Sequence, residues 1–176
     1  MSILVTYASR HGATAGVARV IGETLREGTG TRVDVMPMLD VPHLDGYAAV
    51  VAGSAIQDRR WLPEAMDFLR ANQPALQALP TALFQVCITL GMKNGAAYRA
   101  GVDTWMEPAC AIVPPLRRAS FPGALDPASL PWNKDGIGLR ISVMLGIMPQ
   151  GDRRDWDAVH AWARDLRTLL LRPTPA

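Results

Sequence analysis

The fold is decided near the start of the chain, where an apolar run leads into Tyr7-Ala8-Ser9-Arg10-His11-Gly12-Ala13-Thr14. The run before this stretch, residues 3–7, is rich in β-forming residues and predicts a strand. After it, apolar residues recur at helical spacing as far as Leu25, and Thr14 is the expected N-cap of that helix. The quoted stretch is therefore the connection between a strand and a helix.

This connection carries residues suited to holding a phosphate group. Backbone N–H groups at a helix start have no partners within the helix and carry the positive end of its dipole. Ser9 and Thr14 add hydroxyl groups. Gly12 lets the backbone approach a ligand closely, and Arg10 adds a positive charge. The alternative is an ordinary strand-to-helix turn capped by Thr14.

Two other phosphate-binding loops are excluded by their motifs. The pattern G-x-x-x-x-G-K-[ST] is missing, so the loop is not of the ATP-binding type. The pattern G-x-G-x-x-G does not follow the first strand either, which removes the fingerprint of dinucleotide binding.

Strand and helix signals alternate in the rest of the chain. Further strands are expected at residues 32–36, 48–54, 82–88 and 118–124. Helices are expected from Pro63, over 98–106, over 137–148 and from Trp156, the last capped by Asp155 or Asp152. Strands without polar residues are typical of parallel sheets buried on both faces. The alternation predicts one α/β domain over residues 1–172, with a five-stranded parallel sheet, helices on both faces and a disordered tail at 173–176.

Composition excludes several classes of protein. The chain has 176 residues, 49% hydrophobic and 19% charged, which is enough to build a core. Its two cysteines, Cys87 and Cys110, lie in apolar surroundings and are expected to be buried and inert. A net charge of +2 gives no reason to expect nucleic acid. No metal-ligand spacing occurs, and no window has the roughly 18 apolar residues of a membrane span, so we expect a cytoplasmic protein without a transmembrane segment.

Residues 7–14 resemble the FMN-phosphate loop of the flavodoxin superfamily, written aromatic-x-S-x-x-G-x-T. Gly53-Ser54-Ala55-Ile56 is similar to the loop that lies along the isoalloxazine ring in those proteins. Within the superfamily the chain looks closest to the quinone-dependent protoporphyrinogen dehydrogenase branch, which shares this stretch, Gly123-Ala124-Leu125 and Asp155-Trp156. The likeness runs over nearly the whole chain. It implies a flavodoxin-like fold that binds FMN non-covalently.

The resemblance also implies which residues contact the cofactor, with loops 55–61 and 89–94 bordering the ring. The expected FMN-binding residues are Ser9, Arg10, His11, Gly12, Ala13, Thr14, Ser54, Ala55, Ile56, Gln57, Thr89, Leu90 and Gly91. Trp61 would either stack on the flavin or pack in the core. Arg59 and Arg60 would either meet an anionic substrate, such as a porphyrin propionate, or stay solvated. We expect no separate catalytic residue and no metal ligand.

The function implied is that of an FMN-dependent oxidoreductase. It would transfer electrons between a small organic substrate, for which protoporphyrinogen is the candidate, and a quinone or similar acceptor. An electron-donor protein and a peripheral contact with a membrane are compatible with this function. The apolar stretch 137–148 would either make that contact or form a buried helix. Two alternatives remain, namely a flavodoxin-type electron carrier between protein partners and a binding module without flavin.

Overall fold

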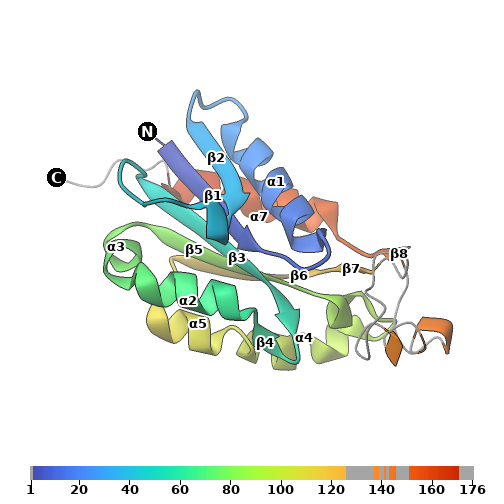
Figure 1. Ribbon diagram of the computed structural model, residues 1–176. Coiled ribbons are helices and arrows are strands. Elements are labelled where there is room, and N and C mark those ends of the chain that lie inside the picture. The colour runs from blue at the N-terminus through green and yellow to red at the C-terminus, as the bar shows by residue number, and fades with distance from the viewer. Residues whose placement is uncertain (1, 126–136, 139–140, 142, 146–150, 171–176) are drawn as a thin grey trace.

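A computed structural model describes residues 2–125, 137–138, 141, 143–145 and 151–170 (Figure 1). Its strands are β1 (Ser2–Ala8), β2 (Arg32–Pro37), β3 (Ala49–Gln57), β4 (Arg60–Trp61), β5 (Thr81–Cys87), β6 (Arg117–Pro122), β7 (Ala124–Leu125) and β8 (Gly151–Asp152). Its helices are α1 (Ala13–Arg26), α2 (Pro63–Ala71), α3 (Gln73–Ala78), α4 (Gly95–Thr104), α5 (Glu107–Ile112) and α7 (Trp156–Leu170). Two short 3₁₀ helices are η1 (Met38–Asp40) and η2 (Ile88–Gly91).

Five parallel strands form the central sheet in the order β2-β1-β3-β5-β6, which confirms the predicted α/β architecture. From β1 the chain goes to β2 on one side, and it then crosses to β3 and continues toward β6 on the other. The strand order therefore reverses between β1 and β3. In open sheets of this kind, ligands bind beyond the carboxyl ends of the strands at such a reversal. The loops after β1 and β3 are thus the first places to look for a site.

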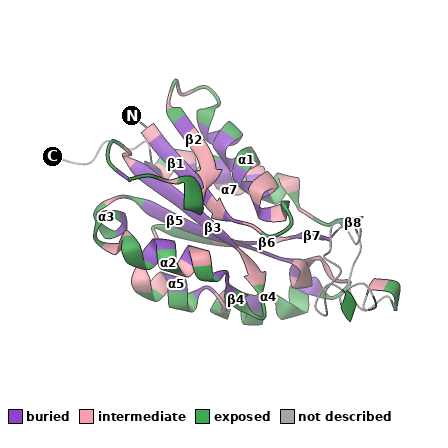
Figure 2. Cartoon of the chain, viewed as in Figure 1, coloured by how far each residue is buried: buried purple, intermediate pink, exposed green. Residues whose placement is uncertain are grey.

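Helices cover both faces of the sheet, as predicted (Figure 1). Helices α1 and α7 pack on one face, where the residues expected to form the stripe of α1 are buried. Helices α2, α3 and α5 pack on the other face. Figure 2 shows the buried residues running along the strands between these two layers.

A close approach between two strands explains a glycine in the middle of β3. Phe84 on β5 is fully buried, and its ring meets Phe121 and Trp162 at centroid distances of 6.5 and 6.3 Å. The same ring lies against Gly53, where a Cβ atom would overlap it. Only glycine lets the ring occupy this position.

The structure corrects the expected start of the first helix. α1 begins at Ala13, because Gly12 adopts the left-handed conformation, with φ of 82°, and serves as the N-cap. Thr14 therefore lies inside the first helical turn, and its side chain makes no capping hydrogen bond. For the last helix, the expected cap Asp155 is confirmed, since its Oδ1 accepts the Ala158 N–H at 2.9 Å.

Other boundaries also differ from expectation. The helix expected over 98–106 begins at Gly95 and ends at Thr104. A further helix, α5, starts at Glu107, in a stretch where the sequence predicted no helix. Pro108 is compatible with this helix because the first turn needs no N–H donor at that position. The third strand runs on to Gln57 and turns back as the β3–β4 hairpin.

Two expectations concern residues near the end of the chain. The tail at 173–176 lies outside the described residues. The helix expected over 137–148 lies partly outside them, and its described residues include the exposed side chains of Ile137, Ile141 and Met144. Among the described residues of this stretch, the expectation of a buried helix is therefore wrong.

Candidate functional site

The loop after β1 is a tight turn that closes on itself. Ser9 Oγ accepts the Gly12 N–H at 3.1 Å, and the Gly16 N–H donates to the Gly12 carbonyl at 3.0 Å. The first N–H groups of a helix have no acceptor inside it, so those of Ala13 and Thr14 are available at this end of α1. Arg10, His11 and Gly12 are exposed around them. The geometry provides a small set of backbone donors open to an anion.

The hydroxyl of Thr14 is the most informative group in this loop. Thr14 is 1% exposed, and its Oγ1 has no hydrogen-bond partner among the residues that the structure describes. Buried polar atoms are nearly always paired, so an orphan beside free N–H groups points to a missing acceptor. No acidic side chain lies in the first turn of α1, so this turn itself offers no counter-charge to the positive end of the helix dipole.

Arg10 forms an ion pair that the sequence did not predict. Its guanidinium lies 3.5 Å from the carboxylate of Glu64, in the first turn of α2. Both side chains keep some contact with solvent, so this ion pair contributes little to stability. Arg10 therefore connects the loop after β1 to α2, and its charge toward an anion is partly offset.

The second candidate loop is the β3–β4 hairpin. Asp58 and Arg59 form its two-residue turn with φ of 50° and 61°, the left-handed pair that suits a tight hairpin. Ala55 and Ile56 are half-buried and Gln57 is exposed. The hairpin thus extends beyond the sheet next to the loop after β1.

The hydroxyl of Ser54, another expected contact, is used within the protein. It is fully buried, accepts the Leu62 N–H at 3.0 Å and donates to the Ala55 carbonyl at 2.8 Å. These two bonds hold the base of the hairpin to the start of α2. Ser54 therefore shapes the loop, and its side chain is not free for a ligand.

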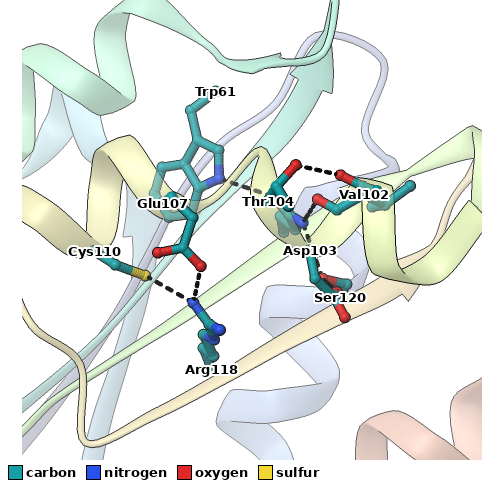
Figure 3. A network of polar contacts seen from close by, with 10 residues as sticks. Trp61, Val102, Asp103, Thr104, Glu107, Cys110, Arg118 and Ser120 are labelled. Atoms are coloured by element: carbon teal, nitrogen blue, oxygen red, sulfur yellow. Dashed lines mark hydrogen bonds and ion pairs between the residues drawn. The ribbon is translucent and has the colours of Figure 1, made fainter.

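Trp61 packs in the core, which decides between the two predicted roles. It is 4% exposed, and its indole N–H donates to Gln85 Oε1 at 3.1 Å (Figure 3). Gln85 is fully buried on β5, and its amide donates to the Val102 carbonyl at 2.7 Å and to Ser120 Oγ at 2.9 Å. The hairpin is thus tied by a satisfied polar network to α4 and β6.

The third candidate loop follows β5 and contains the short helix η2. Thr89 and Gly91 are half-buried, and the Thr89 carbonyl accepts the Met92 N–H at 3.2 Å. Leu90 is buried in a small core cluster with Cys87 and Val102, so its side chain packs in the protein interior. Of the three residues expected here, Thr89 and Gly91 remain near the carboxyl edge of the sheet.

A fourth segment, residues 151–156, lies beside these loops and was missed as part of the site. The Arg153 N–H donates to the Gly123 carbonyl at 3.3 Å. A Cβ atom at Gly91 would lie 2.7 Å from Arg153 Cβ, so this segment packs directly on the third loop. Its partner on the other side is α1, where Arg154 Nη1 lies 3.5 Å from the Ala13 carbonyl. The sequence did contain a signal for this segment, namely two adjacent arginines that follow the last strand and precede a helix cap.

Charges in the described part of the chain suit ligand binding more than acid–base or thiol chemistry. Burial raises the pKa of the half-buried Cys110 thiol, although Arg118 lies 3.8 Å from its sulfur, so the thiolate is disfavoured. Hydrogen bonds from Arg154 hold the pKa of Asp152 below its usual value.

Within the described ranges, no three histidine, cysteine or acidic residues gather where they could hold a metal ion. None of the helices described is long and apolar enough to cross a membrane.

Comparison with known families assigns the chain to one of them. The family model described as a flavodoxin domain matches residues 4–137, well over half of the chain. The chain belongs to the flavodoxin-domain family. FMN is the cofactor that membership of this family indicates, and the donors at the start of α1 fit its phosphate group.

Solved structures share the fold of this flavodoxin-domain chain. A flavodoxin from the domain Archaea has 16% identity and a TM-score of 0.56, covering 98% of this chain and 100% of its own. A cysteine-to-serine mutant of flavodoxin from Pseudomonas aeruginosa has 10% identity and a TM-score of 0.58, covering 97% and 99%. Rubredoxin oxygen:oxidoreductase from Desulfovibrio gigas has 15% identity and a TM-score of 0.55, covering 96% of this chain but 36% of its own. A sequence search among curated proteins finds no match.

Proposed function

We propose that the chain binds FMN at the carboxyl edge of its sheet and acts as an FMN-dependent oxidoreductase. The phosphate would be held by the loop Ser9–Thr14, and the ring would lie between Ala55–Gln57 and Thr89–Gly91. The observation that carries this proposal is the buried, unpartnered hydroxyl of Thr14 next to the free N–H groups of α1. A phosphate dianion supplies the acceptor that this hydroxyl lacks and the negative charge that the helix dipole favours. When bound, the flavin supplies the redox chemistry, and the protein supplies its position and surroundings.

The substrate in this proposal is a small organic anion, with protoporphyrinogen as the candidate, and the acceptor is a quinone. The support for an anion is the basic rim of the site. Arg59 and Arg60 are exposed at the tip of the β3–β4 hairpin. Carboxylates such as porphyrin propionates match the planar fork of arginine. Each quinone reduced takes up two electrons and two protons.

The first test is the visible spectrum of the purified protein, followed by titration of the flavin-free form with FMN. A yellow protein, or saturable binding of FMN, is the expected result. A protein that stays colourless in excess FMN would refute the cofactor assignment and leave the flavin-free binding module.

The second test is turnover with protoporphyrinogen as donor and menadione as acceptor. Replacing Arg59 and Arg60 by glutamine should raise KM for the porphyrinogen by roughly two- to fivefold per residue, the effect of exposed ion pairs of about 0.5–1 kcal/mol. KM for menadione, which is uncharged, should not change. Turnover of neither compound, together with reduction of a partner protein, would favour the electron carrier instead.

A further inference from the structure

The guanidinium of Arg154 occupies a place that the electrostatics of a helix ordinarily disfavour. Its Nη1 lies against the first turn of α1, 3.5 Å from the Ala13 carbonyl. The same atom lies so near Gly16 that a Cβ atom there would overlap it. A positive charge beside a helix N-terminus is repelled by the dipole, so this position needs a compensating reason.

The local structure holds the guanidinium firmly in this position. Nε and Nη2 donate to the two carboxylate oxygens of Asp152 at 2.8 and 2.6 Å, a bidentate pairing. The guanidinium carbon also lies 4.4 Å from the centre of the Trp156 ring, within cation–π range. The side chain of Arg154 is 19% exposed while that of Asp152 is 45% exposed. The cation is thus the inner member of the pair and the carboxylate the outer one.

The pairing leaves Nη1 as the guanidinium nitrogen facing α1, since the carboxylate occupies the other side of the fork. Glycine at position 16 is the feature that lets it approach the helix so closely. In the same helical turn, Thr14 carries the hydroxyl that has no partner among the described residues, and no residue of that turn is acidic. The guanidinium of Arg154 and the first turn of α1 therefore lie together although they are far apart in the sequence.

We infer that Arg154 is a specificity-determining residue of the site, and that its charge makes the chain prefer flavin bearing a phosphate over flavin without one. This inference rests on the proposed binding of FMN. It adds a positive side chain, held by Asp152 and Trp156, to a loop that otherwise offers backbone N–H groups and a hydroxyl. The ligand class is a flavin with a dianionic phosphate ester, as opposed to uncharged riboflavin.

The experiment compares the Kd of FMN with that of riboflavin, measured by flavin fluorescence on the flavin-free protein. Arg154→Gln keeps hydrogen-bonding capacity and removes the charge, and it should raise the Kd of FMN about tenfold while that of riboflavin changes less than about twofold. Arg154→Lys restores the positive charge without the planar guanidinium group, and it should recover most of the preference for FMN over riboflavin. Arg164→Gln, an exposed site on α7, is the control for net charge.

A second variant moves the guanidinium without altering its charge. Gly16→Ala places a methyl group where Nη1 now lies, and alanine also favours the helix, so stability should not fall while FMN binding weakens. The inference is wrong, and Arg154 is only structural, if Arg154→Gln weakens the binding of FMN and of riboflavin equally or weakens the binding of neither. It is also wrong if Arg154→Lys does not restore the preference for FMN over riboflavin. If the unchanged protein binds no FMN, the proposed function itself fails, which is a separate result.

Discussion

Replacing Thr14 by valine should change stability and cofactor affinity in opposite directions. The hydroxyl is 1% exposed and has no partner among the described residues, so the flavin-free protein bears the cost of burying it. Leaving a buried polar group unpaired costs about 1–3 kcal/mol. Valine has the same shape without the hydroxyl, and the two residues have similar helix propensity. Thr14→Val should therefore raise the free energy of unfolding of the flavin-free protein by about 1 kcal/mol or more.

The same substitution should weaken the binding of FMN. In the proposed complex the hydroxyl donates to a phosphate oxygen, and hydrogen bonds to charged groups contribute about 1.5–3 kcal/mol. Losing that bond corresponds to a Kd for FMN raised about ten- to a hundredfold. Urea denaturation of the flavin-free protein measures the first effect, and flavin fluorescence titration measures the second.

Thr6 provides a matched control. It is fully buried in β1, and its hydroxyl also has no partner within the described ranges, but it is not part of the loop that follows the strand. Thr6→Val should stabilise the protein without changing the Kd of FMN. The reasoning is refuted if Thr14→Val binds FMN as tightly as the unchanged protein, or if Thr6→Val weakens binding to the same degree.

Three further substitutions test the packing and charge around the site. Gly53→Ala should lower the free energy of unfolding by about 1–3 kcal/mol in urea denaturation, because the new methyl group overlaps the buried Phe84 ring. Gln85→Leu should cost about 1–3 kcal/mol in the same measurement, because it leaves buried partners unpaired; no loss would show that the network is dispensable. Asp152 has a lowered pKa because of its bonds from Arg154, so its pairing stabilises the protein above the usual aspartate pKa and is lost as pH falls through the lowered value. The stability difference between the unchanged protein and Asp152→Asn should therefore shrink in acid below about pH 4, and a constant difference would contradict the pairing.

The strands of the sheet could be predicted from the sequence because their signal is local. Residues 3–7 and 82–88 are largely apolar and match β1 and β5 to within a residue at each end. The start of α1 could not be placed as well, since the prediction relied on Thr14 as a cap. Capping was instead provided by the left-handed backbone of Gly12, and this conformation depends on the whole turn.

The candidate site shows where prediction from sequence ends. The serine and threonine of the first loop were found by residue type, but type alone does not show which hydroxyl is free. Ser9 bonds to Gly12 and Ser54 bonds to the hairpin, whereas Thr14 has no partner among the described residues. Trp61 likewise had two possible roles until Gln85, 24 positions away along the chain, was seen to accept its N–H. Such pairings depend on tertiary contacts that no local pattern encodes.

The buried hydrogen-bond network around Gln85 joins elements around the site that the loops alone would not hold together. Through Trp61 it fixes the hairpin, and through the Val102 carbonyl it fixes α4, which follows the third loop (Figure 3). Ser120 completes the network, bonding to Gln85 at 2.9 Å and donating to Asp103 at 2.6 Å. The β3–β4 hairpin and the helix that follows the third loop are therefore held together by buried hydrogen bonds within the protein. Since a ligand then need not order them, less of its binding energy is spent on loop closure.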